Sequence, residues 1–248
     1  MSDPVTYQVV DGVAWLTINR PEARNALNAA VREGLWDGIR RFNDDANAQV
    51  LVLTGAGDKA FCAGGDLKEM AQGGLTVPPP DFAPQFGRNI DVAKPTIAAV
   101  NGVAFAGGFL LAQQCDLVVA ADDARFQTAF INLGLVPEAG SSLLLPALIG
   151  RQNANRLLLA GDTLTAEEAE RCSLVAYRVT PDELEPTAQA LAQRLAEKSP
   201  TAMAMTKQLL RQSDAAIKSQ IEKESVLFAE RMFSEDTRER FSKFLKGS

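Results

Sequence analysis

The sequence predicts an α/β fold in which a sheet-forming N-terminal part is followed by a mainly helical C-terminal part. Three observations support this prediction. The chain opens with two alternating strand patterns, a helical pattern separates short apolar strand patterns in the middle, and successive helical patterns follow from about residue 146. Helices that alternate with buried strands are typical of a parallel sheet with helices on its faces.

The two opening strand patterns should form a hairpin. Residues 7–10 and 13–18 alternate between apolar and polar side chains, and Asp11 and Gly12 between them suit a type I′ turn. A helix should follow from about residue 25 until the Asn-Asp-Asp run. Its apolar residues at helical spacing are Leu27, Val31, Leu35, Ile39 and Phe42.

Three short apolar runs are expected to be strands buried on both faces, because they are bounded by turn residues and lack polar alternation. They are residues 50–54, 96–100 and 117–120. The C-terminal part should contain helices with few strands. The expected helices are residues 151–160, 166–172, 181–198, 200–212 and 214–233. Thr180 and Glu183 form a capping-box pattern with a proline between them, which marks one helix start.

Charge and composition exclude several functions. The formal net charge is −6 with no histidine, and a net acidic chain repels a polyanionic backbone, so nucleic acid is not expected as a partner. The absence of histidine excludes Ser-His and Cys-His nucleophile pairs and His-ligated zinc. Proton chemistry must therefore use carboxylates, Lys, Tyr, Cys or the backbone.

Cysteine usage and missing targeting signals favour the cytoplasm. Cys62, Cys115 and Cys172 are odd in number and widely spaced, which suggests neither a disulfide framework nor a thiolate metal site. No secretory signal pattern is visible at the start of the chain. Residues 97–112 are apolar but too short to span a membrane, so we expect them to be buried core.

Two glycine-containing turns could present free backbone N–H groups. Ala63-Gly64-Gly65-Asp66 and residues 102–108 each follow a buried strand and precede a helical pattern. Amides that converge on one point form an anion or oxyanion site; alternatively, the small residues only allow a helix to pack close to the sheet. A dinucleotide site at residues 55–60 is not favoured, because no helix pattern opens there.

Glu138 is the candidate catalytic acid or base. It lies among apolar and small residues in Val-Pro-Glu-Ala-Gly-Ser-Ser, where burial would raise its pKa toward a useful range. The alternative is an ordinary helix cap, because a Pro-Glu pair suits the start of a helix and its positive dipole end.

Four segments, in order along the chain, resemble characteristic segments of the crotonase (enoyl-CoA hydratase/isomerase) superfamily. They are residues 18–27, 60–69, 95–108 and 124–142. The resemblance implies a ββα superhelix with two roughly perpendicular sheets in residues 1–195. It also implies a helical region in residues 196–248 that closes the pocket and builds a homotrimer or a dimer of trimers. The implied ligand is an acyl-CoA thioester, with no cofactor beyond its CoA moiety and no metal.

The resemblance also implies a site. The N–H groups of Ala63 and Gly107 would form the oxyanion hole for the thioester carbonyl. Arg24 and Lys59 are candidates for contact with the CoA phosphates. The full set expected along the substrate and its CoA is Arg24, Ala26, Lys59, Ala63, Gly64, Gly65, Asp66, Leu67 and Gly107. Residues 73–84, rich in glycine and proline, are expected to form a loop that could act as a lid.

The reaction is inferred from which acids are present. Hydratases of the superfamily resemble one another in carrying two glutamates, and the matching positions here are Leu110 and Phe130, which we expect to be apolar pocket wall. The Glu138 segment resembles that of peroxisomal-type Δ3,Δ2-enoyl-CoA isomerases of fatty acid β-oxidation. Moving a double bond needs one base that takes a proton from C2 and returns it at C4. Alternatives are a hydratase, another crotonase-type reaction, or a non-catalytic acyl-CoA binding subunit.

Overall fold

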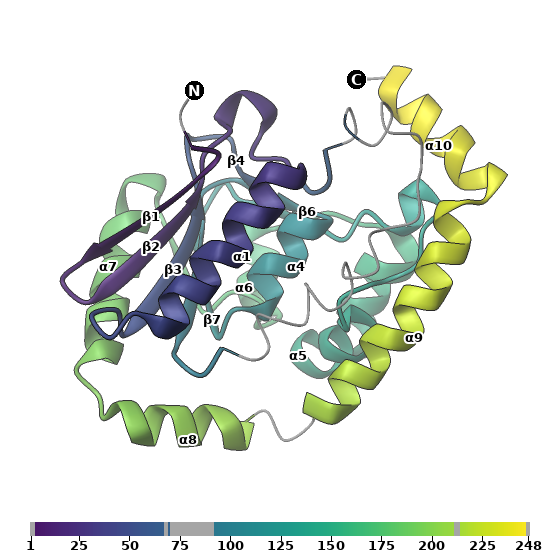
Figure 1. Cartoon of the computed structure of the whole chain (residues 1–248). Coiled ribbons are helices and arrows are strands. Elements are labelled where there is room, and N and C mark those ends of the chain that lie inside the picture. Colours follow the sequence, from purple (N-terminus) through teal and green to yellow (C-terminus); the bar gives the residue numbers. More distant parts are fainter. Residues whose placement is uncertain (1–2, 67–68, 70–91, 211–213, 247–248) are drawn as a thin grey trace.

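The structure, a computed structural model, describes residues 3–66, 69, 92–210 and 214–246. These residues form the predicted α/β fold, with two β-sheets and a helical C-terminal region (Figure 1). The larger sheet has the strand order β1-β2-β3-β5-β7-β10, and the smaller has the order β4-β6-β8-β9.

The chain opens with the predicted hairpin and helix. Strands β1 (Val5–Val10) and β2 (Val13–Ile18) pair antiparallel. Asp11 and Gly12 between them both have positive φ, 49° and 78°, as a type I′ turn requires. After a short 3-10 turn, η1 (Pro21–Ala23), helix α1 (Ala29–Asp44) begins later than predicted. Asn28 caps it, because its side chain accepts a hydrogen bond from the N–H of Val31.

The central part is a spiral in which each turn adds one strand to each sheet. The strand pairs are β3 (Val50–Gly55) with β4 (Ala60–Cys62), β5 (Thr96–Val100) with β6 (Val103–Phe105), and β7 (Leu117–Ala121) with β8 (Arg125–Gln127). The first strand of each pair lies parallel to its neighbours in the larger sheet. The second strands of the three pairs lie parallel in the smaller sheet. Helix α4 (Gly107–Gln114) follows β6.

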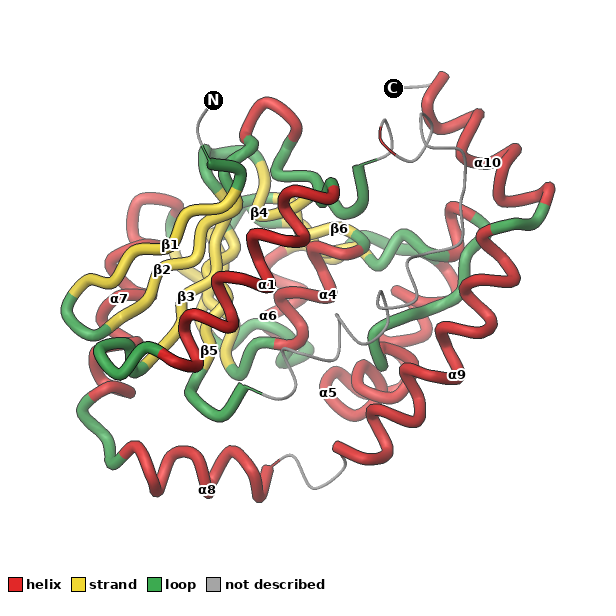
Figure 2. The backbone as a smooth tube through the Cα atoms, viewed as in Figure 1, coloured by secondary structure: helices red, strands yellow, loops and turns green. Residues whose placement is uncertain are grey.

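Strands β3, β5 and β7 of the larger sheet are buried on both faces, as their apolar runs predicted. Alternate residues of one strand belong to different clusters: Leu51 and Leu53 pack with α1, whereas Val50 and Val52 pack with α7 (Pro181–Ala196). Helices α1 and α7 therefore cover opposite faces of this sheet (Figure 2). The period of two along the strand produces this division.

The region after residue 130 differs in detail from the sequence prediction. Its elements are η3 (Ile131–Leu133), α5 (Ser141–Asn155), the π-helical turn η4 (Arg156–Ala160), β9 (Leu164–Thr165), α6 (Ala166–Arg171) and β10 (Tyr177–Val179). Helix α5 contains Pro146 and is interrupted at Gly150, whose φ of 75° and ψ of 154° are not helical. The predicted helix start at residue 151 directly follows this break, whereas the part of α5 before the break was not predicted. Strands β9 and β10 were missed because runs of two and three residues carry no readable alternation. The predicted capping box of Thr180 and Glu183 is present at the start of α7.

The C-terminal region consists of helices α8 (Pro200–Leu210), α9 (Asp214–Met232) and α10 (Glu235–Lys246). Helix α9 lies beside α5 (Figure 1). The division into units 1–195 and 196–248 stays a prediction. Among the described residues, no helix has both the length and the apolar character needed to cross a membrane.

Candidate active site

The two glycine turns predicted from the sequence meet at one end of the smaller sheet. The first follows β4 and the second joins β6 to α4, and these two strands are parallel neighbours. A Cβ atom added to Gly64 would lie 2.8 Å from the Ala106 Cβ and 3.3 Å from the Gly107 nitrogen. Gly64 also has a φ of +90°, which side chains rarely adopt. Only glycine at this position lets the two turns lie against each other.

The backbone donors in these turns differ from the predicted pair. The Ala63 N–H already donates to the Arg24 carbonyl oxygen at 3.0 Å, so it has no hydrogen left for a thioester oxygen, and the prediction for Ala63 is wrong in this structure. The Gly65 N–H donates to no acceptor within the described residues. Gly107 is the first residue of α4, where N–H groups have no intrahelical acceptor. The geometry therefore favours Gly65 and Gly107 as donors.

Ala106 directs the Gly107 amide. It precedes α4 with φ 46° and ψ −117°, a conformation that is unfavourable for a residue with a Cβ atom. Its own N–H donates to the Gln127 carbonyl at 2.9 Å, which ties this turn to strand β8. A strained residue held in place directly before a helix start is an arrangement found at functional sites.

Glu138 is buried and lies outside the helix that follows it. Helix α5 starts at Ser141, and its capping residue is Gly140, without a side-chain cap of its own. Only the backbone carbonyl of Glu138 takes part in this start, by accepting from the Ser141 N–H at 3.1 Å and from its hydroxyl at 2.6 Å. The helix-cap alternative for the Glu138 carboxyl is therefore not what the structure shows.

The environment of Glu138 changes its acidity. Burial raises the pKa of Glu138 from its ordinary value of 4.5 to about 8, and the nearby Glu224 carboxylate adds to the rise. Desolvation disfavours the charged form of a carboxyl group, and so does a like charge. A carboxyl with a pKa near neutral pH can both accept and return a proton.

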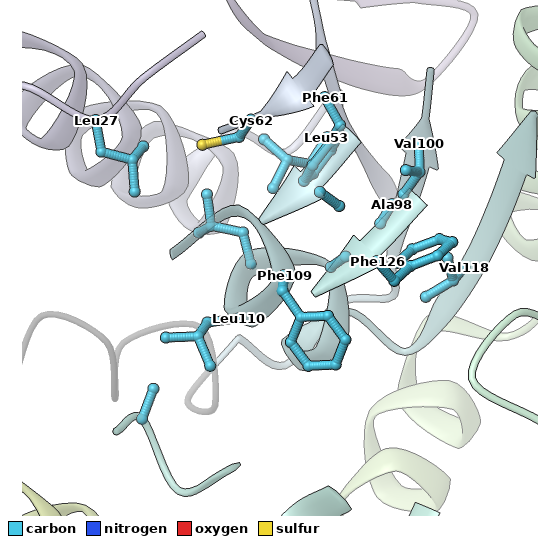
Figure 3. Close-up of a cluster of buried hydrophobic side chains, with 14 of the residues drawn as sticks. Leu27, Leu53, Phe61, Cys62, Ala98, Val100, Phe109, Leu110, Val118 and Phe126 are labelled. Atoms are coloured by element: carbon cyan, nitrogen blue, oxygen red, sulfur yellow. The ribbon is translucent and has the colours of Figure 1, made fainter. Parts of the chain in front are cut away.

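The two positions that match the hydratase glutamates are apolar and buried. Leu110 lies on α4, one turn after Gly107, and is fully buried, while Phe130 is 2% exposed. Figure 3 shows Leu110 and Phe109 projecting from α4 in different directions within one cluster of buried hydrophobic side chains. Leu110 and Phe130 belong to the same buried cluster as Leu135 and Ala139, which lie on either side of Glu138 in the sequence.

An ion pair that the sequence pattern did not predict holds residues 63–66, which are expected to lie along the CoA. Arg20 donates to the Asp66 carboxylate at 3.0 Å and to the Ala26 carbonyl at 2.9 Å. The bridge Leu27↔Gly65 joins the same two segments by backbone pairing. Nothing in the local pattern around Arg20 indicated the ion pair, because Asp66 lies 46 residues further along the chain.

The two basic candidates for phosphate contact fall in different places. Arg24 is exposed, and its carbonyl borders the glycine turn through Ala63. Lys59 is also exposed but precedes β4, four residues and about 13 Å of extended chain from Ala63. The structure brings Arg24 to the turn and leaves Lys59 at the opposite end of β4. Leu67 and the predicted lid at residues 73–84 lie outside the described residues.

Comparison with known proteins identifies the family to which the chain is similar. The sequence matches the family "Enoyl-CoA hydratase/isomerase" over residues 8–247. A 2,3-dehydroadipyl-CoA hydratase from Escherichia coli is 39% identical over 94% of this chain and 92% of that protein. A carnitinyl-CoA dehydratase from Salmonella arizonae is 40% identical over 75% of this chain and 71% of that protein. The crystal structure of an enoyl-CoA hydratase/isomerase from Pseudoalteromonas atlantica superposes with a TM-score of 0.92, at 34% identity, over 98% of this chain and 97% of that one.

Proposed function

Because the chain belongs to the enoyl-CoA hydratase/isomerase family, and so to the crotonase-type acyl-CoA enzymes, we propose that it moves a double bond from C3 to C2 of an enoyl-CoA. One observation carries the proposal. The buried carboxyl of Glu138 has a pKa raised to about 8. The positions of the two hydratase glutamates hold Leu110 and Phe130, both buried.

The proposed mechanism uses backbone amides and one carboxyl. The N–H groups of Gly65 and Gly107 bind the thioester carbonyl oxygen, which makes the C2 proton more acidic. The Glu138 carboxylate removes that proton, and the electron pair of the C2–H bond spreads over the carbonyl and the C3=C4 bond as a dienolate. Protonated Glu138 then delivers the proton to C4, so that the C2=C3 bond forms and the carboxylate is restored. The reaction needs no cofactor beyond the CoA of its substrate.

Apolar residues near the base support isomerisation over hydration. Addition of water requires a water molecule that is oriented and deprotonated in the site. Leu110 and Phe130 offer no hydrogen bond to hold one. Excluding water also keeps the dienolate from side reactions.

Hydration is the second candidate, and the names of relatives favour it. The relatives from Escherichia coli and Salmonella arizonae are called a hydratase and a dehydratase. If this chain were a hydratase, Glu138 alone would have to activate the water molecule. A non-catalytic acyl-CoA binding subunit is the alternative outside enzyme chemistry.

The first experiment separates these functions. Purified protein is mixed with a 3-enoyl-CoA and, separately, with a 2-enoyl-CoA, while the absorbance of the conjugated thioester is followed. We expect the conjugated product to appear from the 3-enoyl-CoA in the wild type and not in Glu138→Gln, with both proteins binding acyl-CoA equally. Loss of the conjugated thioester by hydration would favour the hydratase. If neither substrate is converted, or if Glu138→Gln is fully active, the proposed role of Glu138 is overturned.

We further propose that the exposed apolar residues of α8 and α9 are covered by other copies of the chain, in a homotrimer or a dimer of trimers. Leu210 is 82% exposed and Val226 is 70% exposed, and both belong to the C-terminal helices. Large apolar side chains that are exposed on the surface favour association when they lie together. Light scattering coupled to size exclusion measures the mass, and a monomer at micromolar concentration would contradict this proposal.

A further inference from the structure

The segment that carries Glu138 is held at both ends by the C-terminal helices. At its start, the Gly134 carbonyl accepts hydrogen bonds from the Arg231 Nε at 2.9 Å and from the buried Thr237 hydroxyl at 3.1 Å. At its end, Glu224 of α9 binds the backbone where α5 begins. Residues about 80 to 100 positions later in the chain therefore determine where this segment lies.

Glu224 supplies the cap that α5 lacks. Its carboxylate accepts from the Gly140 N–H at 2.6 Å, from the Ser142 N–H at 3.0 Å and from the Ser142 hydroxyl. The first N–H groups of a helix need acceptors, and a negative charge there is favoured by the helix dipole. Glu224 is 4% exposed. One turn earlier on α9, Gln220 donates to the same Ser142 hydroxyl at 2.9 Å.

The backbone that Glu224 holds is unfavourable by itself. Directly after Glu138, Ala139 and Gly140 have φ angles of 57° and 75°. The left-handed conformation is unfavourable for Ala139, which has a Cβ atom, so contacts with the rest of the protein must maintain it. The bond from the Gly140 N–H to Glu224 is such a contact, one residue beyond the strained alanine.

Glu224 also places a negative charge near the Glu138 carboxyl. The rise in the pKa of Glu138 has two causes, burial and then the Glu224 charge. Arg231, another charged side chain of α9, binds the far end of this segment at Gly134 and is paired with Asp236 at 2.6 Å. The neighbours of Glu138 within the segment, Pro137 and Ala139, carry no charge.

We propose that Glu224 is a positioning residue for Glu138. It holds the turn from which the Glu138 side chain projects, and its charge lies near the Glu138 carboxyl. The inference rests on the proposed function, in which Glu138 moves the proton, and extends it to a residue of the C-terminal helices. Glu224 itself touches neither the substrate nor the reacting atoms.

The first test is the pH dependence of turnover in Glu224→Gln. Glutamine keeps the size of the side chain but loses the charge and presents an NH2 group where one oxygen accepted a hydrogen bond. Removing a like charge favours ionised Glu138, so the acid limb of the kcat profile should move to lower pH by about half a unit to one unit. Misplacement of the base should lower kcat by about ten- to a hundredfold, with KM nearly unchanged.

The matched control is Glu222→Gln, an exposed glutamate on the same helix, two residues away. It makes the same chemical change without contact to the α5 start and should reproduce the wild-type profile. If Glu224→Gln has the wild-type profile and kcat, or loses activity only in proportion to its stability, the inference is overturned.

A second readout does not depend on isomerase activity. In protein carrying ¹³C-labelled glutamate carboxyl groups, the resonance of Glu138 is assigned by its absence in Glu138→Gln. Its titration midpoint should fall in Glu224→Gln and stay unchanged in Glu222→Gln. If the wild type shows no isomerisation, the proposed function fails while this titration still tests Glu224, and an unmoved midpoint refutes the inference.

Glu224→Asp provides the test if the glutamine variant does not fold. Aspartate keeps the charge but shortens the reach to the Gly140 and Ser142 amides. We expect kcat to fall while the pH profile keeps its position. A wild-type kcat in Glu224→Asp would overturn the positioning role.

Discussion

Replacing Glu138 by glutamine should abolish turnover and stabilise the folded protein, and the gain in stability should grow with pH. Burial in the folded state raises the pKa of this carboxyl from 4.5 to about 8. Between these two values the folded state holds a proton that the unfolded state has released. Stability must therefore fall as pH rises from about 4.5 to about 8. Glutamine cannot ionise, so the stability of Glu138→Gln does not fall with pH for this reason.

The size of the effect follows from the same shift. Each pKa unit corresponds to about 1.4 kcal/mol, so ionisation of Glu138 destabilises the wild type by roughly 3 kcal/mol at pH 7 and by about 4 kcal/mol at pH 8. At pH 5 the same contribution is only about 1 kcal/mol. For a domain of this size, the Tm of Glu138→Gln relative to that of the wild type should therefore be higher at pH 8 than at pH 5 by on the order of 10 °C.

The assay is equilibrium unfolding in denaturant at several pH values between 5 and 8.5, at equal protein concentration for the wild type and Glu138→Gln. Any constant effect of repacking cancels when the difference between the two proteins is compared across pH. Glu222→Gln, an exposed glutamate of α9, is the control and should track the wild type. If the difference between Glu138→Gln and the wild type is the same at pH 5 and pH 8, the reasoning about its buried carboxyl is refuted.

Three further substitutions test the surroundings of the site. Gly64→Ala would place a Cβ atom 2.8 Å from the Ala106 Cβ at a φ of +90°. It should cost about 2 kcal/mol or more and remove turnover, and thermal unfolding with the wild-type Tm would contradict this. Gln113 is buried with no hydrogen-bond partner for its amide within the described part of the chain. Gln113→Met should therefore raise the free energy of unfolding by about 1 kcal/mol, and a loss would show that the amide is bound. Lys207 is buried and forms an ion pair with Asp116, so Lys207→Met should destabilise by about 3 kcal/mol in denaturant unfolding, whereas a gain would contradict the pairing.

Several elements could be predicted because their signals are local. The turn at Asp11 and Gly12, the helix around Leu35 and the buried strand at residues 50–55 follow from turn chemistry and from hydrophobic periodicity. The short strands β9 and β10 could not be predicted in this way. Two or three residues are too few for a period, and these strands exist only because the sheets offer them a neighbour.

The candidate site likewise combines features that are local in sequence with features that depend on the tertiary structure. The glycine turns and Glu138 were predicted from the residues alone, since small residues between a strand and a helix, and a carboxyl among apolar residues, are chemical features of the sequence. The exclusion of imidazole chemistry needed only the absence of histidine. These features do not depend on how the chain is arranged in space.

Only the tertiary structure decided which groups are available and what surrounds them. It showed that the Ala63 N–H is taken by Arg24 and that Glu138 is not a helix cap. It also placed Glu224, more than 80 residues later in the chain, on the turn beside Glu138. A hydrogen bond uses a donor once, and a pKa depends on burial and on nearby charges. Both depend on distances between residues far apart in sequence, which no local pattern contains.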